Sequence, residues 1–117
     1  GIGIGGTGDI CMEIAKQAAV LRPVGSRHPE PDIAELETDL IEAINELDRG
    51  HMGAGGLCTV MDVHVEYAAA HTAALPVAFN TQCCLARRAT GRISCDGRVE
   101  YGDRPNWDYR EQAREAL

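Results

Sequence analysis

The chain has 117 residues, of which 44% are apolar, and 18 acidic against 11 basic residues give it a net charge of −7. This length allows one domain with a modest core, and the apolar content predicts a folded chain rather than a disordered one. The acidic balance disfavours nucleic acid and anionic membranes as partners. No apolar run approaches the roughly 20 residues that a membrane span needs. We expect a single mixed α/β domain over residues 1–117.

The five cysteines are an odd number, and their spacings match no small disulfide scaffold. We interpret them as reduced thiols, which predicts a cytoplasmic protein. The chain begins with glycine inside a glycine-rich segment. We therefore expect it to be a piece of a larger polypeptide.

The first six residues, Gly-Ile-Gly-Ile-Gly-Gly, match the dinucleotide-binding fingerprint by letter. Nucleotide binding is disfavoured, because no strand precedes the motif and no acidic residue follows at the usual distance. We expect a glycine turn that leads into a helix. Apolar residues recur at helical spacing over residues 9–21 and predict that helix. Cys11 lies on it and is expected to be a small buried residue.

Residues 32–48 show the strongest helical pattern, with an apolar stripe opposite an acidic face that we expect to be solvated. The preceding loop carries His28, which we expect at the surface. Residues 57–67 alternate and predict a half-buried strand with His64 facing solvent. Residues 75–80 predict a second, buried strand. Residues 90–95 and 98–101 flank Asp96-Gly97, which predicts a type I′ hairpin, and a final helix is predicted over residues 107–117.

The expected architecture is two amphipathic helices packed on a small mixed sheet, followed by the hairpin and the terminal helix. So small a sheet predicts exposed apolar surface where missing partners would dock.

Residues 71–88 concentrate the side chains that can carry chemistry. A histidine precedes the apolar strand, and an amide, two adjacent thiols and two arginines follow it. Thiols bind soft metals, and guanidinium groups hold carboxylates through a bidentate fork. Upstream, residues 50–56 contain four glycines in seven positions, and such a loop can bring backbone N–H groups up to an anion.

Three ordered segments resemble the α region of the class I, iron–sulfur fumarate hydratases and L-tartrate dehydratases. They are Gly-Ile-Gly-Ile-Gly-Gly-Thr at residues 1–7, Gly-His-Met-Gly-Ala-Gly-Gly at residues 50–56, and His-x-Ala-x-Leu-Pro-Val-Ala…Gln-Cys-x-x-Ala-Arg-Arg from His71 to Arg88. The resemblance runs to about Arg92. His51 stands where the family usually has proline, and Leu57-Cys58 stands where it usually has a polar pair containing threonine. These departures imply a substrate preference that differs from that of well-known members.

The resemblance implies a hydro-lyase that adds or removes water on a four-carbon dicarboxylate, either fumarate/malate or tartrate/oxaloacetate. It also implies a 4Fe-4S cluster held by three cysteines. Cys83 matches the last of these ligands, with Cys84 as the second choice, and the other two would lie before Gly1.

The same resemblance assigns the remaining site residues. His71 would contact the substrate carboxylate, or else be a capped structural histidine, and Gln82 would orient the site. The glycine loop would approach the substrate or cluster through Gly53, Gly55 and Gly56. Arg87 and Arg88 would supply charge to bind anions, although surface pairing is as well supported for each.

The implied partners are the missing N-terminal part of the α region and a β region or β subunit, in an oligomer. The isolated chain is expected to be inactive. Two other interpretations stay open: a non-catalytic binding or assembly module of the same fold, and a zinc site using Cys58, Cys83, Cys84 and a histidine. Adjacent cysteines are poor zinc geometry, since Cys-x-x-Cys is usual.

Overall fold

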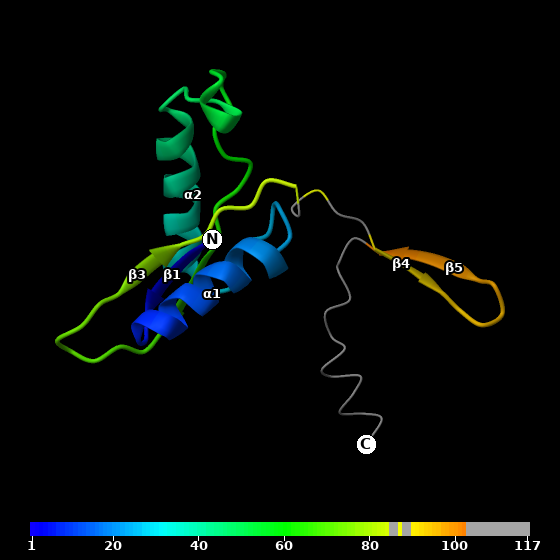
Figure 1. Ribbon diagram of the computed structural model, residues 1–117, viewed down its shortest axis with the longest axis horizontal. Helices are drawn as coiled ribbons and strands as arrows, with labels where there is room; N and C mark the ends of the chain where they lie inside the picture. Colours follow the sequence, from blue (N-terminus) through cyan, green and yellow to red (C-terminus); the bar gives the residue numbers. More distant parts are fainter. Residues whose placement is uncertain (85–86, 88–89, 103–117) are drawn as a thin grey trace. The chain divides into compact units, whose positions relative to one another are not determined.

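The computed structural model describes residues 1–84, 87 and 90–102. They belong to two compact units, Gly1–Gln82 and Cys83–Leu117, and each is described here by itself (Figure 1). The expected mixed α/β class is confirmed. The single domain over residues 1–117 stays a prediction, and the helix expected over residues 107–117 lies outside the described residues.

The first unit contains β1 (Ile2–Gly5), α1 (Gly8–Leu21), α2 (Pro31–Asn45), the 3₁₀ helix η1 (His51–Gly53), β2 (Val65–Ala68) and β3 (Val77–Phe79). The second unit contains β4 (Thr90–Ile93) and β5 (Val99–Gly102).

The glycine-rich start of the chain is a strand, which corrects the expected glycine turn. β1 is the central strand of a three-stranded sheet in the order β2-β1-β3. It pairs in parallel with β2 and antiparallel with β3, so both neighbours satisfy its backbone groups. The turn follows at Gly5 and Gly6, whose φ angles of 82° and 68° are accessible to glycine without strain.

Helix α1 packs directly on the backbone of β1. A Cβ atom on Gly3 would lie 2.1 Å from the carbonyl oxygen of Cys11, so only glycine permits this approach. The contact buries Cys11, Ala15 and Ala18, and the Cys11 thiol donates to the Gly3 carbonyl at 3.1 Å. The buried Cys11 is confirmed. These glycines serve helix–strand packing, which explains why the fingerprint spacing does not indicate a nucleotide site.

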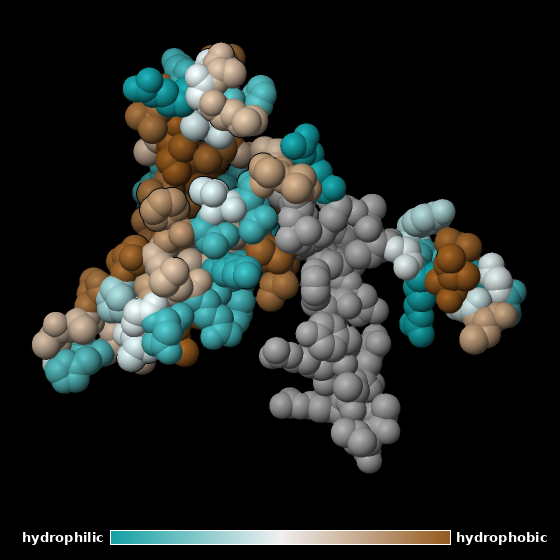
Figure 2. All heavy atoms as spheres, in the orientation of Figure 1, coloured by the Kyte–Doolittle hydropathy of each residue, from teal (hydrophilic) through white to brown (hydrophobic). Residues whose placement is uncertain are grey.

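Helix α2 is attached more loosely. It begins at Pro31 and ends at Asn45, three residues before the predicted end, and β2 is the one other helix or strand it contacts within the described residues. Its acidic face is exposed, as expected, but its apolar stripe is only half-buried. Figure 2 shows apolar side chains exposed along this helix. The fully buried side chain of α2 is that of Glu37.

The strand predicted over residues 57–67 is correct only at its end, since β2 begins at Val65. Upstream, side chains bind the backbone in place of a strand. The Asn45 carboxamide oxygen accepts from the backbone N–H groups of Thr59 at 2.8 Å and Val60 at 3.0 Å. The Asp62 carboxylate accepts from the backbone of Gly25 and the guanidinium of Arg27. The alternating pattern therefore spans a loop that is tied to α2 and to residues 22–30.

The second predicted strand is shorter and less buried than expected. β3 is an edge strand of three residues. Its side chains on the face away from α1, Val77 and Phe79, are 64% and 80% exposed. The buried strand expected over residues 75–80 is therefore wrong in its burial, because nothing in the described first unit covers that face.

The second unit contains the expected hairpin with a different turn. β4 and β5 pair antiparallel, and the Ser94 N–H donates to the Arg98 carbonyl while the Gly97 N–H donates to the Ser94 carbonyl. Gly97 has a φ of 80°, whereas Asp96 is not among the positive-φ residues. A type I′ turn needs positive φ at both central residues, so the loop is a type I turn closed by a glycine bulge.

Candidate functional site

An open pocket of about 690 Å³ lies at the carboxyl end of β1. The turn from β1 to α1 forms one wall through Gly6, Thr7 and Gly8, and the segment after β2 forms another with His71. Ligands of α/β sheets bind in the crevice at the carboxyl ends of parallel strands. Of the described residues that line the pocket, His71 is the one with a titratable side chain.

The imidazole of His71 is oriented by its own turn. The Ala73 N–H donates to its Nδ1 at 3.1 Å, and the Ala74 N–H donates to its carbonyl at 2.9 Å. Nδ1 must therefore carry a lone pair, so in the neutral ring the proton is on Nε2. Nε2–H can donate to a carboxylate or hydroxyl oxygen in the pocket.

The start of α1 is the other polar wall of the pocket. Thr7 precedes the helix, and its hydroxyl donates to the Asp9 carboxylate at 2.5 Å. The Thr7 hydroxyl, followed by the backbone N–H groups of Ile10 and Asp9 itself, lowers the pKa of Asp9. Asp9 therefore already satisfies part of the positive end of the helix dipole. The one hydroxyl proton of Thr7 is donated to Asp9, so an anion entering the pocket would have the imidazole of His71 as its side-chain donor.

Gln82 lies at the opposite end of the sheet. Asn80 donates its backbone N–H to the carbonyl of Gly1, at the start of β1, and the Gln82 amide donates to the Asn80 side-chain oxygen at 3.3 Å. His71 precedes β3 and Gln82 follows it, and the strand between them runs antiparallel to β1. The structure thus does not bring these two predicted site residues together within the first unit.

The glycine loop follows α2 and is held at its base. Gly50 is buried with a φ of 66°, and its N–H donates to the Thr59 hydroxyl at 3.2 Å. A Cβ there would lie 2.1 Å from the Gly55 carbonyl oxygen, so the loop closes tightly on itself. Gly53, Gly55 and Gly56 are exposed, have positive φ and have open space around them. The loop presents bare backbone, as expected, away from the lining of the pocket.

The predicted ligand and anion-binding residues beyond Gln82 belong to the second unit. Cys83 and Cys84 are exposed free thiols. Arg87 forms a turn with these two residues. Its backbone N–H donates to the Cys84 carbonyl, and its guanidinium donates to the Cys83 carbonyl. Arg88 lies outside the described residues.

No group of three or more metal-ligating side chains occurs within the described residues. The donor set still fits a soft metal in part, because an exposed thiol is a suitable single ligand.

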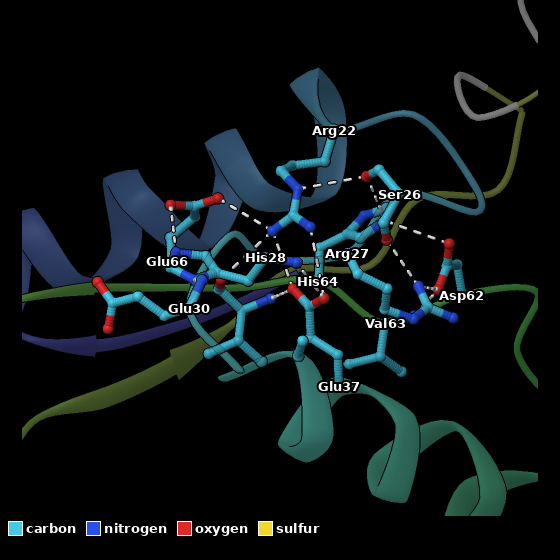
Figure 3. A network of polar contacts seen from close by, with 12 residues as sticks. Arg22, Ser26, Arg27, His28, Glu30, Glu37, Asp62, Val63, His64 and Glu66 are labelled. Atoms are coloured by element: carbon cyan, nitrogen blue, oxygen red, sulfur yellow. Dashed lines mark hydrogen bonds and ion pairs between the residues drawn. The ribbon is translucent and has the colours of Figure 1, made fainter. Parts of the chain in front are cut away.

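A second polar cluster, which we call the buried network, joins α1, α2 and β2 (Figure 3). Arg22 at the end of α1 forms an ion pair with Glu37 at 2.8 Å, where the carboxylate is fully buried, and a second with Glu66 at 3.2 Å. The Glu37 carboxylate also accepts from the backbone N–H groups of Val65 at 2.8 Å and His28 at 3.0 Å. Arg22 donates to Glu37 from both Nη1 and Nη2, so together with the two backbone groups four hydrogen bonds satisfy this buried charge.

Two histidines in the buried network correct the sequence-based expectations. The His28 side chain is 9% exposed and has its Nε2 4.0 Å from Glu66. His64 is 5% exposed instead of facing solvent, and burial lowers its pKa. Its Nε2 lies 3.2 Å from Asp62 and 3.4 Å from the Ser26 hydroxyl.

This serine, histidine and aspartate do not form a nucleophilic triad. Both partners meet the same ring nitrogen, whereas a triad needs one on each. The buried network is therefore structural.

Sequence reasoning did not find Glu37, although a signal was present. Glu37 stands four residues after Ile33 and three before Leu40, which places a carboxylate inside the apolar stripe. A charge in such a position is buried only when paired. Thr7 ends the family-like segment at residues 1–7, but no site role was predicted for it.

A strand–glycine turn–helix unit with a histidine across the pocket is an arrangement that binds a small anion. The chain is also similar to known proteins. The family model described as fumarate hydratase (fumerase) matches residues 1–92. A putative L(+)-tartrate dehydratase subunit alpha from Methanocaldococcus jannaschii is 50% identical over 99 residues, which are 85% of this chain and 34% of that protein. L(+)-tartrate dehydratase subunit alpha from Escherichia coli (strain UTI89 / UPEC) is 43% identical over 96 residues, 82% of this chain and 31% of that protein.

The chain therefore belongs to the fumarate hydratase family, and the resemblance to its class I and tartrate dehydratase members is confirmed. It spans about a third of the length of the curated relatives it matches.

Proposed function

We propose that this chain is part of the α subunit of a hydro-lyase that adds or removes water on a four-carbon dicarboxylate. Family membership supports the reaction class. The observation that carries the proposal is the pocket between His71 and the turn before α1. Apart from Thr7 and His71, the residues that line it are glycine, alanine and larger apolar residues, so a short anionic substrate would be oriented by few polar contacts.

The residues have distinct proposed roles. His71 donates from Nε2 to a substrate carboxylate, and Gln82 and the glycine loop contribute from elsewhere in the assembled enzyme. Cys83, with Cys84 as second choice, is one ligand of a 4Fe-4S cluster, and Arg87 and Arg88 hold the second carboxylate. When bound, such a cluster supplies a Lewis acid for the leaving hydroxyl group.

The remaining ligands and catalytic groups would come from the rest of the α polypeptide and from a β region or subunit, so the 117-residue chain alone would be inactive. All five cysteines are free thiols in the structure, which supports assembly in a reducing, cytoplasmic compartment. No helix among the described residues has the length and apolar character to cross a bilayer.

The test uses Cys83→Ser, with Cys84→Ser as its matched control, in the full α polypeptide assembled with its β part under anaerobic conditions. Iron, acid-labile sulfide and the dehydration of L-tartrate and malate are measured. We expect Cys83→Ser to lose cluster and activity and Cys84→Ser to retain both. Equal iron content in the two variants would overturn the Cys83 assignment, and zinc in place of iron would overturn the cluster.

His71→Asn separates binding from cluster assembly. Asparagine keeps a donor but cannot reproduce the reach of Nε2, so we expect normal iron content with KM raised and kcat reduced. An unchanged KM for both substrates would exclude His71 from substrate contact.

A further inference from the structure

The sheet of the first unit has one covered face and one bare face. Gly3 is the inward position of β1, since a Cβ there would meet the Cys11 carbonyl oxygen of α1. Side chains alternate along a strand, so Ile2 and Ile4 are on the other side. Directly paired residues share a face, and the register adds these to it: Val65 and Phe79 beside Ile2, and Tyr67 and Val77 beside Ile4.

This bare face is apolar and largely open. Phe79 is 80% exposed, Val77 is 64% exposed and Tyr67 is 48% exposed, while Ile2 and Ile4 are half-buried. Val65 of β2 lies on the same face and is fully buried. The exposed part of this face therefore lies over β1 and β3. None of these six side chains carries a formal charge, and the Tyr67 hydroxyl reaches the rim to donate to Glu30 at 2.6 Å.

Two arguments show that such a face needs a partner. The described part of the chain fully buries only five apolar residues, Cys11, Ala15, Ala18, Val63 and Val65, of which three are alanine or cysteine. A core of that size supplies little of the free energy that folding requires. All-parallel sheets, moreover, occur almost only with both faces covered, and the β1–β2 half of this mixed sheet is a parallel pair with α1 on one side.

We infer that an amphipathic helix from the rest of the α polypeptide covers this bare face. The inference rests on the proposed function, in that it takes the chain to be part of an α subunit. The relatives are about three times as long as the matched segment, so the family's α polypeptide has the length to supply a helix. Because the face is uncharged, the segment that covers it must present an apolar stripe. In layered α/β architectures the element that packs on a sheet face in this way is a helix.

Hydroxyl-radical footprinting of the unmodified protein tests this inference. Oxidation of Phe79 and Tyr67 is compared between the 117-residue chain and the full α polypeptide, with Tyr101 of the hairpin, 88% exposed, as internal reference. We expect oxidation of Phe79 and Tyr67 to fall about tenfold in the full α polypeptide without any β subunit, since reaction then needs local opening.

Three results would overturn the inference. Protection that appears only after the β subunit is added assigns the face to that subunit. Protection that rises with the concentration of the 117-residue chain assigns it to a second copy, and no protection in any assembly removes the docking site.

Phe79→Asp provides an independent test with Phe79→Leu as its matched control. A charge at this position is harmless while exposed but costly once covered. We expect Phe79→Asp to leave the 117-residue chain as soluble as Phe79→Leu does, yet to reduce the folded yield of the full α polypeptide at least several-fold. Equal yields would contradict the inference. Iron content and activity are measured separately, so a protein with a protected face and no cluster would refute the proposed function alone.

Discussion

Helix α1 and helix α2 are attached to the same structure by different interactions. α1 lies against glycine backbone and buries Cys11, Ala15 and Ala18, so its position depends on the absence of a side chain at Gly3 of β1. α2 fully buries no apolar side chain, and its buried residue is Glu37, in an ion pair with Arg22. Apolar contact tolerates small shifts, whereas a carboxylate with four hydrogen bonds has one correct position. The polar attachment therefore orients α2, which carries the glycine loop at its end.

The largest expected effect comes from removing the buried carboxylate of Glu37, which attaches α2 through its ion pair with Arg22. Glu37→Ala leaves Arg22 and the N–H groups of Val65 and His28 without their buried acceptor, which should cost about 3–5 kcal/mol of the stability of the first unit. Hydrogen exchange of the β1 and β2 amides measures that loss. Glu35→Ala on the exposed face of the same helix is the control and should cost little. Equal exchange in the two variants would mean that Glu37 does not hold α2.

Breaking the close packing of α1 should cost less but still be measurable. In Gly3→Ala the new Cβ would lie 2.1 Å from the Cys11 carbonyl oxygen, so the helix must move, at about 1–3 kcal/mol. Gly8→Ala is the matched control, because a Cβ there meets nothing within 4 Å. The same exchange measurement should show destabilisation in Gly3→Ala alone. If both variants behave alike, the glycines of β1 are not needed for packing.

The attachment of the loop to Asn45 gives an effect of similar size that is more local. Asn45→Ala removes the acceptor of the Thr59 and Val60 N–H groups, which should cost about 1–3 kcal/mol at that position. We expect faster exchange in residues 46–60 with little change in β1. Glu46→Ala, its exposed neighbour, serves as control. A uniform rise in exchange across the first unit would show that the loop is not a separate element.

The smallest effect concerns pH. Burial lowers the pKa of His64 below its ordinary value of 6.5, so the unfolded state binds more protons as the pH falls below about 6.5. Stability is fully present above that value and decreases below it. His64→Gln should flatten the dependence between pH 6.5 and more acidic conditions, whereas His51→Gln at an exposed position should not. Identical slopes would mean that His64 does not titrate with folding.

The bare face extends the same comparison, because α1 covers one side of the sheet and, on the other side, nothing described in the first unit covers Val77 and Phe79 of β3. Comparing the folded yields of Phe79→Asp and Phe79→Leu in the full α polypeptide therefore tests whether a second helix packs on the bare face, as α1 packs on the opposite one.

Much of this protein follows from its sequence alone. Periodicity located both helices within a few residues, because a helical stripe is a local property of the chain. The order of three motifs was sufficient to predict the family, and free cysteines and an exposed apolar surface were expected before the structure was known.

Tertiary structure decided the rest, since it depends on which distant groups meet. Whether Gly3 forms a turn or a central strand depends on its pairing with β2 and β3. The apparent strand before Val65 is a loop because Asn45 binds its backbone and the Asp62 side chain binds Gly25 and Arg27. His71 faces a pocket at one end of the sheet while Gln82 lies at the other, because β3 runs antiparallel to β1. Sequence spacing reports local conformation, but these contacts join residues tens of positions apart, and only the folded chain brings them together.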